Sequence, residues 1–234
     1  MILEICANSY ESAINAQIAG AHRIEICSEL SVGGITPSVG LLEKISKEIS
    51  IPVHVLIRPR SGNFCYSNSE FEQMKTDILL CKKLGFQGIV SGVLTKNHEI
   101  DIEKTKQLIS LSKPLKFTFH RAFDVVVNPK KTVQILQDLG VDRILTSGTK
   151  EKASDGIDLL IELKKITENK LIILPGSGIN KDNVTLFKNA GFEEIHTSAS
   201  KIITDKKSIF FDKTTQTVSD IETIKTILKS INNA

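Results

Sequence analysis

Ionisable side chains gather at the end of one short apolar run in the middle of the chain. The segment Lys116–Phe119 alternates polar and apolar residues, and His120, Arg121 and Asp124 follow it with no helix signal between them. An imidazole, a guanidinium and a carboxylate this close together can move protons and bind an anion. The same groups can also form a structural ion pair that only orients a loop. The run marks a candidate site and leaves both roles open.

Alternation along other short runs places further polar residues on one face. Side chains alternate between the two faces of a strand, so residues two apart share a face. The pairs that share a face are Glu4 with Cys6, Glu25 with Cys27, His54 with Arg58, Thr118 with His120, and His196 with Ser198. The carboxylates of Glu4 and Glu25 would be costly inside a core unless cations or protons paired with them. We expect Arg58 and His120 to be these partners.

A catalytic interpretation assigns roles to these residues. Glu4 or Glu25, with a raised pKa, would act with His120 as an acid and base pair. Arg58 and Arg60 would hold an anionic substrate beside that pair. The alternative is an internal ion network without chemistry, which buried ionisable groups often form. Both interpretations predict burial, but only the catalytic one predicts an open pocket.

Glycine-rich and hydroxyl-rich loops late in the chain indicate a place for a phosphate group. Gly176 and Gly178 follow one apolar run, and His196 lies in the next, which ends before Ser198. In many barrel enzymes, backbone amides of the loops after the last two strands surround a phosphate. Thr146, after an earlier strand, would extend the polar rim. The alternative is a tight turn that simply needs glycine.

Eight short apolar runs, separated by amphipathic helical segments, would position these side chains. The predicted strands are Ile2–Cys6, Arg23–Cys27, Val53–Arg58, Gly88–Ser91, Leu115–His120, Arg143–Thr146, Leu171–Leu174 and Glu194–Thr197. Helix starts are predicted at Ser69 with Glu72 as a capping box, at Asn128 before Pro129, at Asp101 or Asn180 as N-caps, and at Ser219 for the last helix.

The regular spacing of these units favours a closed barrel. Eight strand and helix pairs leave about 29 residues for each pair, close to the size of a βαβ unit. A pattern of helix, glycine and strand recurs at Gly20, Gly85, Gly140 and Gly191. We therefore predict an α/β fold with a single domain over residues 1–234, a (β/α)8 TIM barrel. An open, doubly wound sheet is the structural alternative.

Composition excludes several classes of protein. The chain is 41% hydrophobic and 24% charged, and its formal net charge of +3 comes from interspersed residues that form no basic block. This gives no support for nucleic-acid binding. No apolar stretch reaches the ~18 residues of a membrane span, and no secretory signal opens the sequence. We expect a cytoplasmic protein with free thiols and no membrane contact. A homo-oligomer stays open, because no separate hydrophobic surface stripe is evident.

Several segments together resemble the CutC family. The resemblance is carried by Glu4-Ile5-Cys6, Arg23–Ser28, Gly33–Ser38, Pro52–Arg60, Thr118–Asp124, Asp142–Gly148, Pro175–Gly178 and His196. These segments cover nearly the whole chain, and the resemblance implies a (β/α)8 barrel. CutC proteins are described as cytoplasmic copper homeostasis proteins, without an established reaction.

The resemblance implies a copper function for Cys6 and Cys27, which fall in the family's two Glu-x-Cys motifs. Adjacent strands would bring their sulfur atoms together as a soft, two-coordinate site suited to Cu(I). The alternative is that both are small buried hydrophobic residues, as free cysteines often are. A second class of function also stays open: an enzyme of unassigned reaction that acts on a small phosphorylated or carboxylated metabolite at the C-terminal mouth of the barrel.

Overall fold

Eight parallel strands form a barrel in the computed structural model, which describes residues 1–203 and 215–232. The strands are β1 (Ile2–Ala7), β2 (Arg23–Ile26), β3 (Val53–Leu56), β4 (Gly88–Ser91), β5 (Lys116–Phe119), β6 (Arg143–Thr146), β7 (Ile172–Pro175) and β8 (Glu194–Thr197). Strands β1 to β6 each pair with the next one along the chain, and β1 also pairs with β8. A parallel bridge between Gly176 and His196 joins β7 to β8. The TIM-barrel prediction is confirmed, and the predicted boundary at residue 234 lies outside the described residues.

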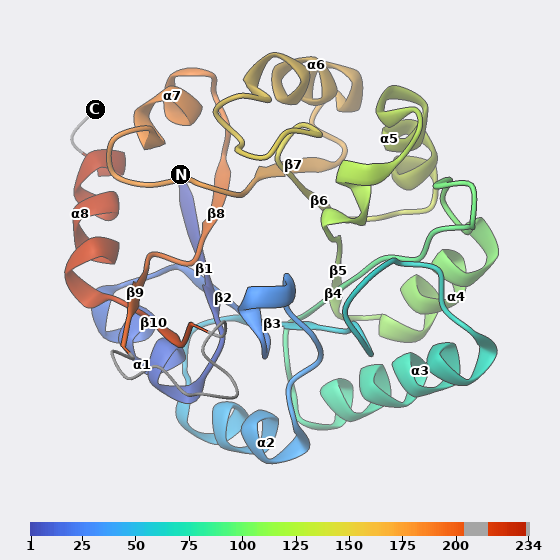
Figure 1. Cartoon of the computed structure of the whole chain (residues 1–234), viewed down its shortest axis with the longest axis horizontal. Coiled ribbons are helices and arrows are strands. Elements are labelled where there is room, and N and C mark those ends of the chain that lie inside the picture. The colour runs from blue at the N-terminus through green and yellow to red at the C-terminus, as the bar shows by residue number, and fades with distance from the viewer. Residues whose placement is uncertain (204–214, 233–234) are drawn as a thin grey trace.

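Helices surround the barrel, as Figure 1 shows. They are α1 (Tyr10–Ala19), α2 (Val39–Glu48), α3 (Asn68–Lys83), α4 (Ile102–Ser112), α5 (Pro129–Asp138), α6 (Ile157–Thr167), α7 (Val184–Asn189) and α8 (Ile221–Asn232). Two 3-10 helices, η1 (Leu30–Val32) and η2 (Arg121–Val125), follow β2 and β5. Strands β9 (Ser200–Ile202) and β10 (Thr217–Ser219) pair in an antiparallel manner beside α1. Within these ranges no helix has both the length and the apolar character needed to cross a membrane.

Helix starts agree with the sequence at two places. Asp101 accepts from the backbone N–H of Lys104 and begins α4, and Asn128 accepts from that of Lys131 and begins α5, with proline at the first helical position. The last helix begins at Ile221, two residues after the predicted start at Ser219. A shift of two residues is of the size expected for the end of a helix.

Two predicted caps are wrong. The capping box of α3 is formed by Ser67 and Glu70, not by Ser69 and Glu72. Both pairs have the same spacing, but the earlier one places Tyr66 before the cap and Phe71 on the first buried turn, as in a hydrophobic staple. Helix α7 begins after Asn183 rather than after Asn180, whose side chain instead accepts from the N–H of Asp182.

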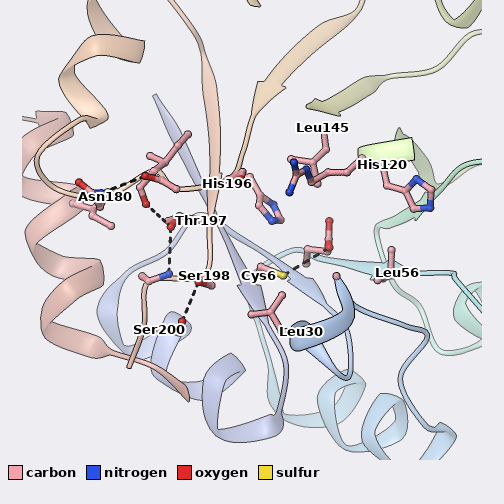
Figure 2. A pocket seen from close by; sticks show the side chains of 18 of the residues that line it. Cys6, Leu30, Leu56, His120, Leu145, Asn180, His196, Thr197, Ser198 and Ser200 are labelled. Atoms are coloured by element: carbon pink, nitrogen blue, oxygen red, sulfur yellow. Dashed lines mark hydrogen bonds between the residues drawn. The ribbon is translucent and has the colours of Figure 1, made fainter. Parts of the chain in front are cut away.

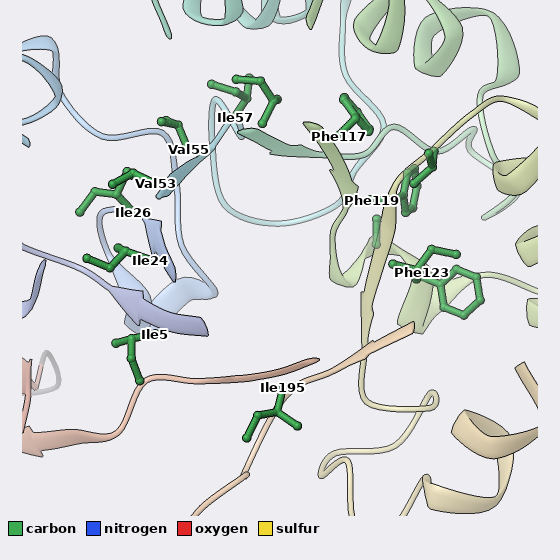
Figure 3. Packing of buried hydrophobic residues seen from close by; sticks show 14 of the residues in the cluster. Ile5, Ile24, Ile26, Val53, Val55, Ile57, Phe117, Phe119, Phe123 and Ile195 are labelled. Carbon is green, nitrogen blue, oxygen red and sulfur yellow. The ribbon is translucent and has the colours of Figure 1, made fainter. Parts of the chain in front are cut away.

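The hydrophobic core lies between the strands and the helices. Ile5, Ile24, Val55 and Phe117 are completely buried and point away from the barrel axis (Figure 3). Because side chains alternate along a strand, the residues between them point into the barrel. The polar half of each strand is therefore directed to the interior, where the candidate site lies.

A glycine on β4 makes room for one of these inward side chains. A Cβ atom on Gly88 would lie 2.3 Å from Cδ2 of His54, far inside van der Waals contact. His54 is only 3% exposed. A larger residue at position 88 would displace the imidazole from the barrel interior.

Candidate functional site

A buried ion network occupies the barrel interior near the amino ends of the strands. Arg23 donates hydrogen bonds to both Glu4 and Glu194, and Nε of Arg143 lies 2.8 Å from Oε2 of Glu194. Glu4, Arg23 and Glu194 are all at most 5% exposed. Burial alone would raise the pKa of Glu4, but the attraction of Arg23 and of the histidines nearby holds that pKa well below its usual value. Glu4 is therefore a charged structural partner of Arg23.

The predicted partners of Glu4 and Glu25 are wrong. Arg58 and His120 make no ion pair or hydrogen bond with either carboxylate in the described part of the chain. Arg23 takes the place of Arg58 because it lies directly beside Glu4 in the register of β1 and β2. The sequence could have indicated this pairing. Arg23 is two residues before Glu25, so the alternation of side chains along a strand places Arg23 on the same inward face.

Arg58 instead holds two loops together. Its guanidinium donates to the carbonyl oxygens of Val32 and Gly34, at 2.9 and 2.8 Å, and to that of Gly62 at 2.9 Å. The ring centre of Phe64 lies 4.9 Å from its central carbon. The Nε atom of Arg58 is buried and has no hydrogen-bond partner among the described residues.

Two cysteines, a glutamate and a histidine meet above the ion network. The Sγ atoms of Cys6 and Cys27 lie 3.8 Å apart, and Sγ of Cys6 is 3.9 Å from Oε1 of Glu25. One donor atom each from Cys6, Glu25 and His196 lie within 4.8 Å of one another. Nδ1 of His196 is 2.8 Å from Oε1 of Glu4, which connects this cluster to the ion network. The set combines soft sulfur donors with an imidazole and a carboxylate, which can hold a soft metal ion.

Burial and mutual interactions shift the pKa values in this cluster. The hydrogen bond with Cys27 and burial raise the pKa of Cys6 well above its usual value, so the thiol is protonated rather than a reactive thiolate. Burial also raises the pKa of Glu25 to about 7. Burial lowers the pKa of His196, but Glu25, Cys6 and Glu4 outweigh this effect and raise it overall.

A cavity of about 510 Å³ opens above this cluster, at the carboxyl ends of the strands. Cys6, Glu25, Arg58, His120 and His196 all line it, and Figure 2 shows Cys6 and His196 close to each other with His120 on another part of the wall. Its remaining walls are Leu30, Gly33, Leu56, Phe64, Arg121, Leu145, Ser177, Gly178, Ile179, Asn180, Thr197, Ser198, Ala199, Ser200, Thr223 and Ile227. The size is that of sites for small organic ligands.

His120 borders the cavity as a neutral imidazole. Burial, with the nearby charge of Arg58, lowers its pKa to about 3. Its Nδ1 atom accepts from the N–H of Ala122 at 3.3 Å, so the proton of the neutral ring lies on Nε2. That Nε2 atom is buried and unpartnered within the described ranges. Phe64 packs against the ring with a centroid separation of 4.9 Å.

Five predicted site residues do not border the cavity within the described ranges: Glu4, Arg60, Thr146, Gly176 and Cys27. Glu4 is enclosed by the ion network, and Arg60 pairs with Glu70 at 2.5 Å. Thr146 is fully buried, and its hydroxyl donates to Asp124 at 2.5 Å.

The two predicted glycines and Arg121 have clear positions. Gly176 makes room chiefly for Leu145, since a Cβ atom there would lie 2.5 Å from Cδ1 of Leu145 and 3.3 Å from the Cβ of His196, while Gly178 borders the cavity. Nε of Arg121 is 2.7 Å from Oδ2 of Asp124, the pairing that one interpretation of the sequence predicted.

Sequence reasoning missed part of the site. Glu194 shares a face with His196 by the same alternation that identified the histidine. Thr223 and Ile227 also border the cavity, although they lie on the last helix. No sequence signal marks them, because a helix outside the barrel does not ordinarily reach its mouth.

The fold and the site define a (β/α)8-barrel protein with a buried pair of thiols beneath a cavity at the carboxyl ends of its strands. The chain belongs to the CutC family, whose model matches residues 1–201. A CutC family protein of Edwardsiella ictaluri is 45% identical over 203 residues, which cover 87% of this chain and 80% of the relative. One from Erwinia tasmaniensis is 46% identical over 85% of this chain and 79% of the relative.

One solved structure supports the same assignment, and a second shares the fold alone. The CutC protein of Streptococcus agalactiae, whose name assigns it provisionally to copper homeostasis, has a TM-score of 0.80 and 33% identity, over 85% of this chain and 98% of that one. Thiamine phosphate pyrophosphorylase from Pyrococcus furiosus has a TM-score of 0.62 and 14% identity, over 99% and 96% of the two chains. At that identity the second similarity concerns the fold alone.

Proposed function

We propose that this chain is a copper homeostasis protein that binds Cu(I) through Cys6 and Cys27. The observation that carries the proposal is the 3.8 Å separation of the two Sγ atoms, of which that of Cys6 belongs to a residue that lines the cavity, while Cys27 is buried behind it. Soft thiolate ligands select Cu(I) over hard cations. The similarity to the Streptococcus agalactiae protein supports the same role. Free cysteines suit a reducing compartment, so we place the protein in the cytoplasm.

The donor set fits such an ion. With metal–sulfur bonds of about 2.3 Å, two sulfur atoms that share one ion on opposite sides lie about 4.6 Å apart. The observed 3.8 Å is shorter, which leaves one side of the ion for a further donor. We propose His196 as that donor, because its ring nitrogen lies within 4.8 Å of the Cys6 sulfur and of a Glu25 oxygen; the Cys27 sulfur does not belong to that group and would shift toward the ion on binding. We therefore propose three protein ligands instead of the two-coordinate site expected from the sequence.

Cu(I) binding by cysteine variants tests this proposal. Titration against a coloured Cu(I) chelator should find one tightly bound ion in the wild-type chain and none in Cys6→Ser/Cys27→Ser. The matched control, Cys65→Ser/Cys81→Ser, alters the other two thiols and should bind like the wild type. Unchanged binding in the first double variant, with a native circular dichroism spectrum, would sink the proposal.

A histidine variant tests the third ligand. His196→Asn keeps a polar side chain at the site but removes the imidazole. We expect affinity for Cu(I) to fall by about tenfold or more, the range found when groups that support a metal site are lost. Equal affinity in the variant and the wild type would leave Cys6 and Cys27 as the whole site.

The second candidate function is an enzyme of unassigned reaction that acts on a small phosphorylated or carboxylated metabolite, with the copper role indirect or absent. The cavity favours it, because barrel enzymes have their active sites at the carboxyl ends of the strands. Glu25 and His120, two of the expected catalytic residues, border that cavity. Native mass spectrometry of gently purified protein, searched for a retained small anion and for copper, separates the two candidates.

A further inference from the structure

The geometry points to a phosphate subsite in the cavity, formed by the loops after β7 and β8. We infer that the ligand is a small phosphorylated organic molecule whose phosphate group accepts from the backbone amides of Gly178, Ile179 and Ser198. This inference deepens the second candidate function and rests on it. It does not depend on copper binding, because none of these three residues belongs to the cysteine cluster.

Three backbone N–H groups that lie in residues lining the cavity have no acceptor among the described residues. In the described part of the chain, the N–H groups of Gly178, Ile179 and Ser198 donate to no protein acceptor. Neighbouring amides are satisfied: that of Asn180 donates to the Asn183 side chain at 2.9 Å. Backbone N–H groups left free where a chain turns form concave sites for anions.

The two loops are fastened to each other. The hydroxyl of Thr197 donates to the carbonyl oxygen of Ile179 at 2.7 Å, which joins the end of β8 to the loop after β7 (Figure 2). The hydroxyls of Ser198 and Ser200 lie 3.1 Å apart on the same wall of the cavity. Amides and hydroxyls from these two joined loops thus border the same cavity. A group with several acceptor oxygens, such as phosphate, can use more of them than a carboxylate can.

Three buried polar atoms lie elsewhere in the wall of the cavity. Oε2 of Glu25, Nε of Arg58 and Nε2 of His120 have no partner among the described residues. Their side chains are at most 5% exposed, and all three border the same cavity. A buried polar group without a partner costs free energy. These two donors and one acceptor lie in the wall of the cavity and are closed off from solvent, so a ligand with polar groups beyond the phosphate would reach them only by displacing the side chains around them.

Apolar side chains in the cavity wall suit the body of an organic ligand. Leu30, Leu145 and Ile227 are among the residues that border the cavity. Ile227 and Thr223 come from α8, outside the residues that the family model matches.

Amide chemical shifts test the subsite directly. Inorganic phosphate is added to isotope-labelled full-length protein, with sodium chloride at equal ionic strength as the control, and two-dimensional 1H–15N spectra are recorded. We expect saturable shifts of the Gly178, Ile179 and Ser198 amides with phosphate only. The absence of a saturable shift at these amides, or equal shifts with chloride, would overturn the inference.

Two variants of Ser198 with side chains of the same shape, one charged and one neutral, distinguish an effect of charge on phosphate binding from an effect on structure. Ser198→Asp places a carboxylate beside the free amides and should abolish the shifts, whereas Ser198→Asn should retain them. Ser198 is half-buried and only its hydroxyl contact with Ser200 is lost in both. Equal phosphate binding in the two variants would contradict an anion site here.

Two further arms complete the test. Phenyl phosphate should bind more tightly than inorganic phosphate, because its ring buries apolar surface against Leu145 and Ile227; equal affinity would overturn the assignment of an organic ligand.

Cys6→Ser/Cys27→Ser should retain phosphate binding. Loss of phosphate binding in this variant would overturn the assignment of the phosphate group to the loops after β7 and β8. Phosphate binding without Cu(I) binding refutes only the copper proposal, and the reverse refutes only this inference.

Discussion

Nδ1 of His196 lies 2.8 Å from Oε1 of Glu4, so one buried carboxylate orients the imidazole beside the cysteine pair. The other oxygen of Glu4 accepts from Arg23. A single carboxylate therefore connects the ion network at the bottom of the barrel to the candidate metal site above it. Its removal should affect both the stability of the fold and the position of His196.

We expect Glu4→Gln to destabilise the protein strongly. The variant leaves the charge of Arg23 buried with one fewer anionic partner, and breaking a buried ion pair in this way costs about 3–5 kcal/mol. Urea unfolding followed by circular dichroism measures the change. The control is Glu222→Gln, which removes an exposed partner of Lys225 and should cost less than about 1 kcal/mol. Similar losses in the two variants would contradict a structural role for the network.

A double-mutant cycle tests the packing of Gly88 against His54. Gly88→Ala adds a methyl group where the imidazole now lies, and overpacking of this kind costs about 1–3 kcal/mol. In the background of His54→Ala, which vacates that space, the same substitution should cost much less. Additive free energies of unfolding in the double variant would show that the two positions do not interact.

Arg58→Lys should loosen the loops that Arg58 joins. Lysine keeps the charge but cannot donate to three carbonyl oxygens in a fixed fork as arginine does. We expect faster amide hydrogen exchange in residues 58–66 and 30–36, with exchange in α6 unchanged as the internal control. Unaltered exchange in both loops would mean that other contacts hold them.

His120 should make stability depend on acidity. Burial lowers its pKa to about 3 in the folded chain, from a usual value of 6.5. Between these values the unfolded state binds one more proton, so this contribution is fully present above pH 6.5 and is lost as the pH falls. One such group changes the free energy of unfolding by about 1.4 kcal/mol per pH unit.

His120→Asn isolates this effect from the other titrating groups. The free energy of unfolding of the wild type, minus that of the variant, should decrease by about 1.4 kcal/mol for each pH unit below 6.5. Urea unfolding at pH 7.5, where both side chains are neutral, sets the baseline difference from lost packing. A difference that stays constant down to pH 4.5 would place the imidazole in contact with solvent.

Local patterns in the sequence predicted the barrel and much of the site. Alternation along the short strands assigned Cys6, Glu25 and His196 to the interior, and the structure brings them together. A two-residue period needs only the pleat of a strand, so it can be read without knowing any neighbour. The capping pattern of α3 was ambiguous, because Ser67 and Ser69 both precede a glutamate at the same spacing.

Partners across strands could not be predicted in this way. Arg23, rather than Arg58, pairs with Glu4 because the register of β1 and β2 places them side by side, while Arg58 lies beyond the end of β3. Likewise, nothing local shows that the last helix borders the cavity at Thr223.

Which side chains point into the barrel could be predicted from the residues alone, because side-chain direction follows from the backbone of each strand. Which of those side chains meet depends on how the strands are arranged in the folded barrel. Cys6 and His196 are distant in the chain and become neighbours because β1 pairs with β8 when the barrel closes. Strand register and barrel closure depend on the packing of the whole ring of strands, so neither can be predicted from the residues of a single strand.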